Sequence, residues 1–189
     1  TPEYIRLKMS EGKAIIALHR SDGVESFAGF CYIETWSAKK YVANSGLIVS
    51  PDFRKSGLAK RIKQRALELS RDKYPEAKIF GITTSHAVMK INTELGYVPV
   101  PFSELTDDEE FWNGCRSCPN HDILTRTHRR MCLCTGMLYD ANAKRPQTDA
   151  QQQLYTIDLP TAEPPQEHSF SEQLNTEPDE QQTLDCPCV

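Results

Sequence analysis

Hydrophobic and polar positions follow two different periods along the first 140 residues of the chain. Short runs rich in apolar and β-branched residues at 13–18, 27–36, 41–49 and 78–84 predict four strands. Residues 58–74 instead repeat apolar side chains every three or four positions, which predicts a helix with one apolar face. That face is predicted to consist of Leu58, Ile62, Ala66 and Leu69. The solvent-facing side is predicted to carry Lys60, Arg61, Lys63, Gln64, Arg65 and Glu68.

The connections between these elements predict how the sheet is arranged. Ser21-Asp22-Gly23 is a turn sequence, so the strands at 13–18 and 27–36 should form an antiparallel hairpin. The strands at 41–49 and 78–84 should be parallel, because a helix joins them. The chain is therefore expected to form an α/β sheet with both kinds of pairing.

The residues after position 84 complete the predicted fold. Residues 85–95 have the apolar spacing of a helix, and Gly96 stands where helices commonly end in left-handed backbone. Two prolines make 98–102 extended. Residues 106–112 predict a short acidic helix with Thr106 as its N-cap, and 131–139 predicts the last strand.

One stretch between a predicted strand and a predicted helix has the composition of an anion-binding loop. It consists of Arg54-Lys55-Ser56-Gly57-Leu58-Ala59 and opens the helix at 58–74. The small residues Gly57 and Ala59 let backbone N–H groups approach a diphosphate, while the helix dipole and two cationic side chains favour its negative charge. The alternative is an ordinary helix start in which Ser56 is the N-cap.

This loop resembles the pyrophosphate-binding loop of the GNAT-type N-acetyltransferases, which is written Arg/Gln-x-x-Gly-x-Gly/Ala. Residues 85–97 are also similar to the family, because they end in Leu-Gly-Tyr where the family's fourth helix ends in Leu-Gly-Phe/Tyr. The resemblance covers 13–140 and implies an α/β (α+β) fold with a mixed twisted sheet and helices on both faces. In that fold the parallel strands at 41–49 and 78–84 splay apart, and the gap admits the pantetheine arm of coenzyme A.

The resemblance implies an N-acyltransferase that moves an acetyl group from acetyl-CoA to the amine of a small molecule. A backbone N–H near Ile48 or Val49 would polarise the thioester carbonyl. Asn92 stands where many family members carry the tyrosine that protonates the leaving thiolate, so it would only hydrogen-bond the coenzyme and the general acid is unassigned. Two other hypotheses stay open: a protein N-acetyltransferase, or a regulatory module that binds coenzyme A without turnover.

A base must accept the proton that the acceptor amine loses. Glu34 is the preferred candidate, since a carboxylate between Tyr32 and Trp36 would be partly buried, with a raised pKa. His86, at the start of the predicted helix at 85–95, is the second candidate. For both residues the competing interpretation is an ordinary solvated side chain.

Four cysteines form a constellation near the end of the predicted domain. Cys115 and Cys118 form a C-x-x-C pair in a predicted loop, and Cys132 and Cys134 follow on the predicted strand at 131–139. Residues two apart on a strand face the same side, so four thiolates would gather in the tetrahedron of a structural zinc site. Reduced thiols buried as small hydrophobic side chains, or a redox pair in the C-x-x-C, are the alternatives.

The cysteine-rich segment, 111–135, also resembles a bacterial GNAT subgroup linked to arginine biosynthesis. The acceptor of that subgroup would be an amino acid such as glutamate. Its carboxylate would need a cation, for which Arg126, Arg129 and Arg130 are candidates. The expected partners are thus coenzyme A, a small amine or amino acid and, as one option, a second copy of the chain in a homodimer.

Composition limits the remaining classes of function. The chain has 189 residues and a net charge of −4. Residues 141–189 hold two basic and nine acidic residues and half of the 12 prolines, which predicts a disordered acidic tail after a GNAT domain at 1–140. The first 140 residues carry a net charge of only +3, so no nucleic-acid partner is expected.

Other features of the sequence bear on its location and its first residues. No apolar run approaches the length of a membrane span, and no secretory signal is visible. With 7 cysteines, an odd number, and no such signal, a cytoplasmic location without a membrane partner is expected. Because the chain begins with Thr1, it is expected to be trimmed and to lack the family's first strand, with residues 4–9 ending the second family helix.

Overall fold

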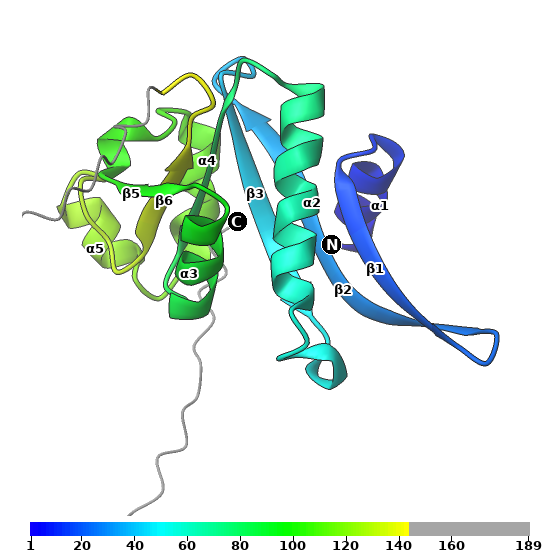
Figure 1. Cartoon of the computed structure of the whole chain (residues 1–189). Helices are drawn as coiled ribbons and strands as arrows, with labels where there is room; N and C mark the ends of the chain where they lie inside the picture. The colour runs from blue at the N-terminus through cyan, green and yellow to red at the C-terminus, as the bar shows by residue number, and fades with distance from the viewer. Residues whose placement is uncertain (144–189) are drawn as a thin grey trace, which may run out of the picture. The chain divides into compact units, whose positions relative to one another are not determined.

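The computed structural model describes residues 1–143. Most of the predicted acidic tail at 141–189 therefore lies outside the described residues. The helices and strands are α1 (Pro2–Ser10), β1 (Ala14–Ser21), β2 (Val24–Trp36), β3 (Tyr41–Val49), α2 (Leu58–Lys73), β4 (Lys78–Thr83), α3 (His86–Glu94), β5 (Val98–Val100), α4 (Glu109–Asn113), α5 (His121–Arg126) and β6 (Thr135–Tyr139) (Figure 1). None of the described helices is long and apolar enough to cross a membrane.

The strands form one six-stranded mixed sheet in the order β1-β2-β3-β4-β6-β5. β1 and β2 are an antiparallel hairpin, and Asp22 and Gly23 in its turn both have positive φ, at 51° and 77°. Such a two-residue turn matches the right-handed twist of paired strands. β3 and β4 are parallel, while β4 and β5 each pair with β6 in the antiparallel direction. The predicted mixed sheet and the predicted parallel pair are confirmed.

The parallel pair is short, and this creates the feature that positions the site. β3 and β4 pair only from Tyr41 opposite Lys78 to Ala43 opposite Phe80. β3 continues to Val49 with β2 as its partner on the other side. The edge of β3 that faces β4 is thus open after Ala43, as expected for strands that splay apart.

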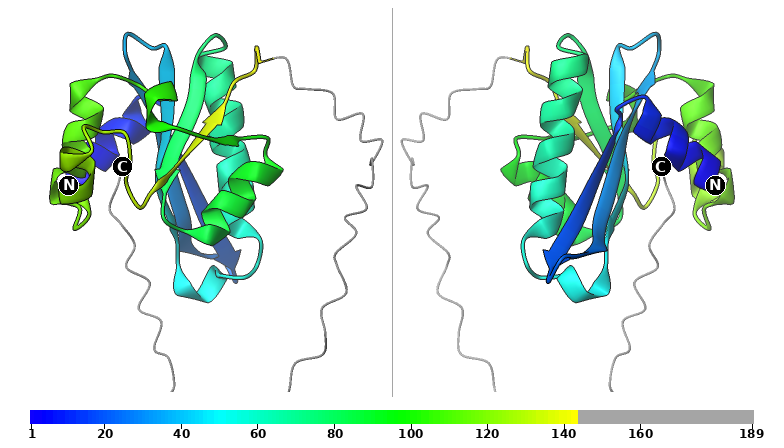
Figure 2. Two further views of the ribbon diagram at one scale, coloured as in Figure 1. Left: turned by 90° about the vertical axis from the view of Figure 1, so that its left-hand side faces the viewer. Right: turned by 90° about the vertical axis from the view of Figure 1, so that its right-hand side faces the viewer.

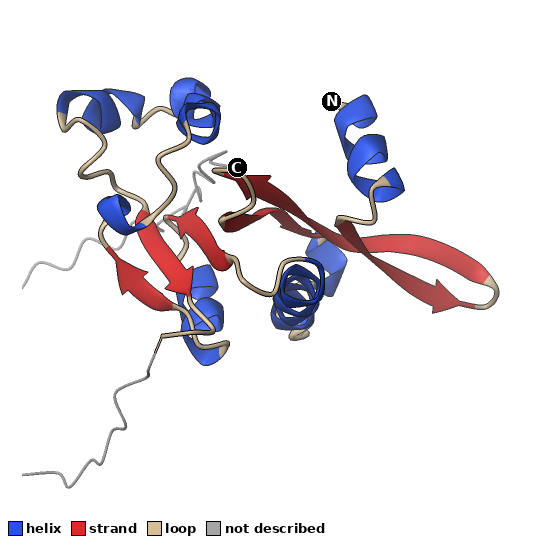
Figure 3. Ribbon diagram, turned by 90° about the horizontal axis from the view of Figure 1, so that it is seen from above, coloured by secondary structure: helices blue, strands red, loops and turns tan. Residues whose placement is uncertain are grey.

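Helices cover both faces of the sheet, as predicted. α2 and α3 lie on one face, and α1, α4 and α5 lie on the other (Figure 2). Figure 3, in which α2 is seen end-on, shows α1 across the sheet from it. Each face has its own core, one around Val42, Ile62 and Tyr97 and one around Phe80 and Phe111.

The face of α2 that meets the sheet differs from the predicted one. Its buried residues are Ile62, Lys63, Ala66, Leu67 and Ser70. The predicted solvent-facing position of Lys63 is wrong, because this lysine is only 3% exposed. The buried stripe of a helix covers a third or more of its circumference, so polar side chains at its margin can also point inward.

Two predicted boundaries near the end of the domain are also wrong. The N-cap of α4 is Asp108, whose side chain accepts a hydrogen bond from the backbone N–H of Glu110. Thr106, predicted to be that N-cap, is buried and bonded to Ser37. β6 begins only at Thr135, so the residues at 131–134 precede the strand.

Candidate functional site

The loop between β3 and α2 is folded by its own polar contacts. Arg54 Nε donates to the carbonyl of Val49 at 3.2 Å, and Ser56 Oγ donates to the carbonyl of Phe53 at 2.7 Å. The N-cap of α2 is Gly57, and no side chain caps the helix there. The alternative in which Ser56 is the N-cap is therefore wrong.

The N-terminus of α2 has open space at Gly57 and no acidic residue in its first turn. Gly57 has φ of 79°, and a Cβ built on it would meet no atom within 4 Å. Lys55 also has positive φ, at 61°. The first turn of α2 contains no acidic residue, and the helix is 16 residues long. Its first backbone N–H groups, from Leu58 onward, have no partner within the helix and favour an anion.

The open edge of β3 leads directly into this loop. Ile48 and Val49 are paired with Phe30 and Gly29 of β2, so their strand partner among residues 1–143 lies on the side away from β4. Ile48 is 54% exposed. The structure thus brings the predicted coenzyme residues of β3 and of the loop at 54–59 to one end of the opening between β3 and β4.

Two buried polar atoms near this opening have no hydrogen-bond partner in the described structure. They are Ser45 Oγ on β3 and Asn92 Oδ1 on α3, in residues that are 2% and 1% exposed. Nearly all buried polar atoms of native proteins are hydrogen bonded. The sequence had suggested Asn92 as a coenzyme contact, and its unpaired carbonyl oxygen is available to a ligand.

Comparisons by sequence find no counterpart, since no family model and no curated protein match the chain. Comparisons of structure do find similar proteins. N-acetylglutamate synthase from Neisseria gonorrhoeae, complexed with coenzyme A and N-acetyl-glutamate, is 17% identical with a TM-score of 0.48, and the match covers 76% of this chain and 28% of that one. An acetyltransferase from Bacillus subtilis in complex with CoA is 13% identical with a TM-score of 0.46, over 74% and 84% of the two chains.

Rv2747 from Mycobacterium tuberculosis, in a complex that contains CoA, is 17% identical with a TM-score of 0.50, over 72% of this chain and 80% of that one. This likeness agrees with the mixed sheet, the parallel pair that parts and the helices on both faces. The chain has the GNAT fold. It spans only 28% of the length of the gonococcal synthase.

Glu34 pairs with a residue of α1, the helix on the face of the sheet opposite to α2. It is not the base with a raised pKa that the sequence suggested. Its carboxylate forms an ion pair with Lys8 of α1, a residue that is 4% exposed, and another with Lys13 at 3.3 Å. Burial alone would raise the pKa of Glu34, but the hydrogen bond from Lys8 and the two positive charges lower it. The predicted raised pKa is wrong, because the sequence did not show that α1 packs against β2.

Two tyrosines that the sequence did not single out lie beside Glu34. Tyr4 of α1 donates to Glu34 at 3.3 Å, and its ring meets that of Tyr32 edge-on at 5.5 Å. Tyr32 lies over Gly46, where a Cβ would come within 2.7 Å of its ring. Burial raises the pKa of Tyr32, so the phenol stays neutral.

His86, the second predicted base, is exposed at the start of α3. It belongs to α3, which lies on the same face of the sheet as α2, whereas Glu34 pairs with Lys8 of α1, the helix on the other face (Figure 2). The structure therefore does not bring the two predicted bases together. A catalytic role for either of them stays a prediction.

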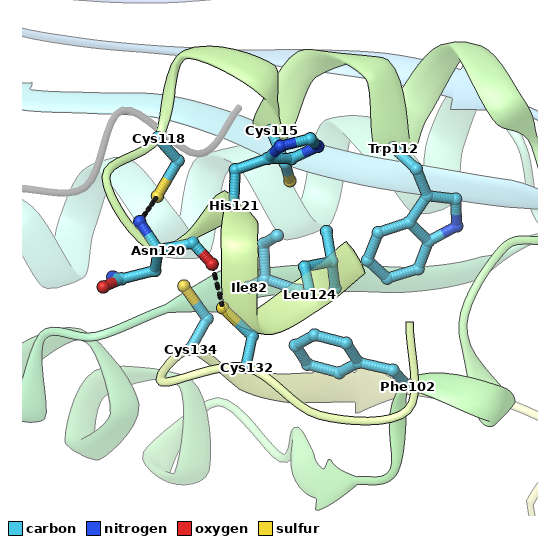
Figure 4. A pocket seen from close by; sticks show the side chains of 10 residues that line it. All are labelled: Ile82, Phe102, Trp112, Cys115, Cys118, Asn120, His121, Leu124, Cys132 and Cys134. Atoms are coloured by element: carbon cyan, nitrogen blue, oxygen red, sulfur yellow. Dashed lines mark hydrogen bonds between the residues drawn. The ribbon is translucent and has the colours of Figure 1, made fainter. Parts of the chain in front are cut away.

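The four cysteines of the predicted zinc site lie around one pocket together with His121 (Figure 4). Within residues 1–143, however, no group of three or more histidine, cysteine or carboxylate side chains is arranged to hold a metal ion. Cys132 and Cys134 precede β6 and so lack the shared strand face on which the zinc prediction depended. Asn120 lies between the sulfurs, donating its N–H to Cys118 Sγ at 3.5 Å and accepting from Cys132 Sγ at 3.9 Å.

These cysteines are surrounded by hydrophobic core side chains. Cys115 is 4% exposed and packs in the cluster that contains Phe102, Trp112 and Leu124. Cys132 is less buried than the other three, and burial raises the pKa of its thiol. Of the interpretations offered by the sequence, thiols that pack as small hydrophobic side chains agree best with this environment.

Proposed function

We propose that this protein is an acetyl-CoA-dependent N-acetyltransferase that acts on the amine of a small molecule. One observation carries the proposal: α2 begins at a glycine without a side-chain cap, beside the open edge of β3. The backbone N–H groups after Gly57 would hold the diphosphate of coenzyme A, with Arg54 and Lys55 adding positive charge. The pantetheine arm would then follow the open edge of β3 from Val49 inward.

The reaction is a direct attack of the neutral amine on the thioester. A bond forms between nitrogen and the acetyl carbon, the carbon–sulfur bond breaks, and its electron pair leaves on sulfur. The nitrogen loses one proton, which balances the proton that the thiolate takes up. Backbone N–H groups on the open edge of β3 would stabilise the negative charge that develops on the carbonyl oxygen.

We assign the binding site of the acceptor amine to the face of the sheet that carries α1. A hollow of about 500 Å³ on that face is lined by Glu34, Asp108 and Glu110 and by Lys39. Trp36 also lines this hollow, and its indole N–H is buried and lacks a hydrogen-bond partner in the described structure. Glu34 is paired with Lys8 and Lys13, and Asp108 accepts from the backbone N–H groups of Ser37 and Glu110. Glu110 and Lys39 would therefore hold the ammonium and the carboxylate of an amino acid.

The arginines suggested for the acceptor carboxylate fit this role less well. Arg129 forms a bidentate pair with Glu109 at 2.6 Å, and Arg126 lies 3.8 Å from Asp122. Their charges are therefore partly neutralised. Glutamate remains the first acceptor to test, since the resemblance of the cysteine-rich segment to the arginine-biosynthesis subgroup supports it.

Release of free thiol from acetyl-CoA, measured over a panel of amines, amino acids and a lysine-rich protein, tests the proposal. We expect turnover with a small amine and none with the protein. Turnover only with the protein would favour a protein N-acetyltransferase. Binding of coenzyme A without turnover for any acceptor would favour the regulatory module. Failure to bind coenzyme A at all would overturn the proposal.

A further inference from the structure

Lys63 is a buried cation on α2. It is 3% exposed, its Nζ donates to Asn44 Oδ1 at 3.4 Å, and it lies 5.5 Å from the centre of the Tyr97 ring. The hydroxyl of Tyr97 donates to the same Asn44 oxygen at 2.6 Å, and Asn44 Nδ2 donates to Ser70 Oγ at 3.1 Å. In residues 1–143 no carboxylate contributes to the electrostatic surroundings of Lys63.

The fold itself gains little from this charge. An ammonium removed from water without an anionic partner is costly, and one neutral hydrogen bond and one ring face do not offset that cost. Burial accordingly lowers the pKa of Lys63. A methionine would fill the same space between α2 and the sheet without the cost.

Lys63 contacts β3 next to the point where β3 and β4 stop pairing. Asn44, to which it donates, directly follows Ala43, the last residue of β3 that pairs with β4. Lys63 is on the same helix as the loop proposed to hold the diphosphate, about 9 Å further along its axis. A coenzyme bound at Gly57 whose arm enters the opening would approach Lys63 with its sulfur end.

A second observation also points to a ligand here. Asn92 Oδ1, which is buried and without a partner in the described structure, belongs to the helix that leads into Tyr97. A cation without an anionic partner and an unsatisfied amide oxygen are both costly in a protein core. The negatively charged end of a ligand would pair with the cation, and an N–H group of the same ligand would satisfy the amide oxygen, which can only accept.

We propose that Lys63 supplies the positive charge that holds the thiolate of coenzyme A at the end of the opening where β3 and β4 stop pairing. The inference rests on the proposed function. When the carbon–sulfur bond breaks, its electron pair leaves on sulfur, and the ammonium of Lys63 forms an ion pair with that thiolate. The proton lost by the acceptor nitrogen later returns to sulfur, so that coenzyme A leaves as the thiol and Lys63 is unchanged. Lys63 thus takes over part of the task of the tyrosine that Asn92 replaces.

Binding of coenzyme A and of desulfo-coenzyme A, measured by calorimetry at several pH values from about 7 upward so that the range in which thiolate and ammonium coexist is covered, tests this role without requiring turnover. Wild-type protein should bind coenzyme A about tenfold more tightly than the desulfo analogue. Lys63→Met should bind both equally, and Lys63→Arg should keep most of the preference. Lys60→Met is the matched control, since Lys60 is on the same helix but is exposed and paired with Glu94 at 2.6 Å.

The outcomes separate this inference from the proposed function. If Lys63→Met keeps the tenfold preference, or if the wild type shows none, the inference is overturned while coenzyme binding stands. If the wild type binds neither compound, both are overturned. Equal loss of preference in Lys60→Met would show a general effect of helix charge and would also contradict the role of Lys63.

The stability of Lys63→Met gives an independent prediction. The variant should melt roughly 3 to 10 °C above the wild type near pH 7, because it removes the cost of the buried charge. The folded pKa of Lys63 lies below its unfolded value, so the unfolded chain binds more protons and wild-type stability rises with pH through that range. The advantage of the variant should therefore shrink towards pH 10.

The other titratable groups that face Lys63 do not change the direction of this pH dependence of stability. They are Cys31 of β2 and Tyr97, and burial raises the pKa of both, so that both stay neutral near pH 7. Thermal melting followed by circular dichroism at several pH values measures the effect. A variant that melts below the wild type at every pH would show that the lysine stabilises the fold.

Discussion

Replacing Gly57 with glutamate is expected to weaken the binding of coenzyme A at least 100-fold, about 2.7 kcal/mol. The new carboxylate would stand at the N-terminus of α2, where the diphosphate is proposed to bind, and like charges repel. The side chain itself meets free space, since no atom lies within 4 Å of a Cβ at this position. The loss should thus come from electrostatics and backbone strain, with the core unchanged. Calorimetric titration with coenzyme A measures it.

The chain offers a matched control for the backbone strain. Gly23, in the turn between β1 and β2, has φ of 77° and also has no atom within 4 Å of a built Cβ. Gly23→Glu introduces the same side chain at nearly the same φ, in a turn outside the β3–α2 loop. It should bind coenzyme A like the wild type. An unchanged dissociation constant in Gly57→Glu would instead show that the diphosphate does not bind at the start of α2.

The elements that carry this site could be predicted because local signals agree there. The apolar run at 41–49, the cationic loop with Gly57 and the periodic stretch at 58–74 each specify their own structure, and their order requires a parallel pair. Gly96 was predicted to end a helix and does adopt φ of 93° after α3. Such features depend on residues close together in the sequence, which is why sequence patterns can show them.

The features that could not be predicted depend on contacts between distant segments. Whether Lys63 points inward depends on Asn44 and Tyr97, which lie on other elements. The environment of Glu34 depends on the packing of α1, which carries Lys8 to it from 26 positions away. A polar residue looks the same in sequence whether it is solvated or buried with a partner. Buried polar networks are therefore the part of a site that structure must supply.

The ion pair of Glu34 leads to the second large effect. Glu34→Gln should destabilise the protein by about 2 kcal/mol, because the substitution leaves the buried ammonium of Lys8 with only Glu11, at 3.4 Å. Chemical denaturation measures this change. The double variant Lys8→Met/Glu34→Leu should recover most of the loss, since it removes both charges together.

The same variants distinguish an ion-pair role from catalysis. A carboxylate whose pKa is held low by Lys8 and Lys13 is a weak base, so folded Glu34→Gln should keep kcat within a few-fold of the wild type. A loss of 100-fold or more would make Glu34 the general base. Because the folded pKa of Glu34 lies below its unfolded value, the pair should stabilise the protein fully above about pH 5 and lose that contribution as the pH falls through the folded pKa. Glu34→Gln should lack this part of the acid sensitivity, and equal acid sensitivity in both proteins would show that the ion pair does not contribute to stability.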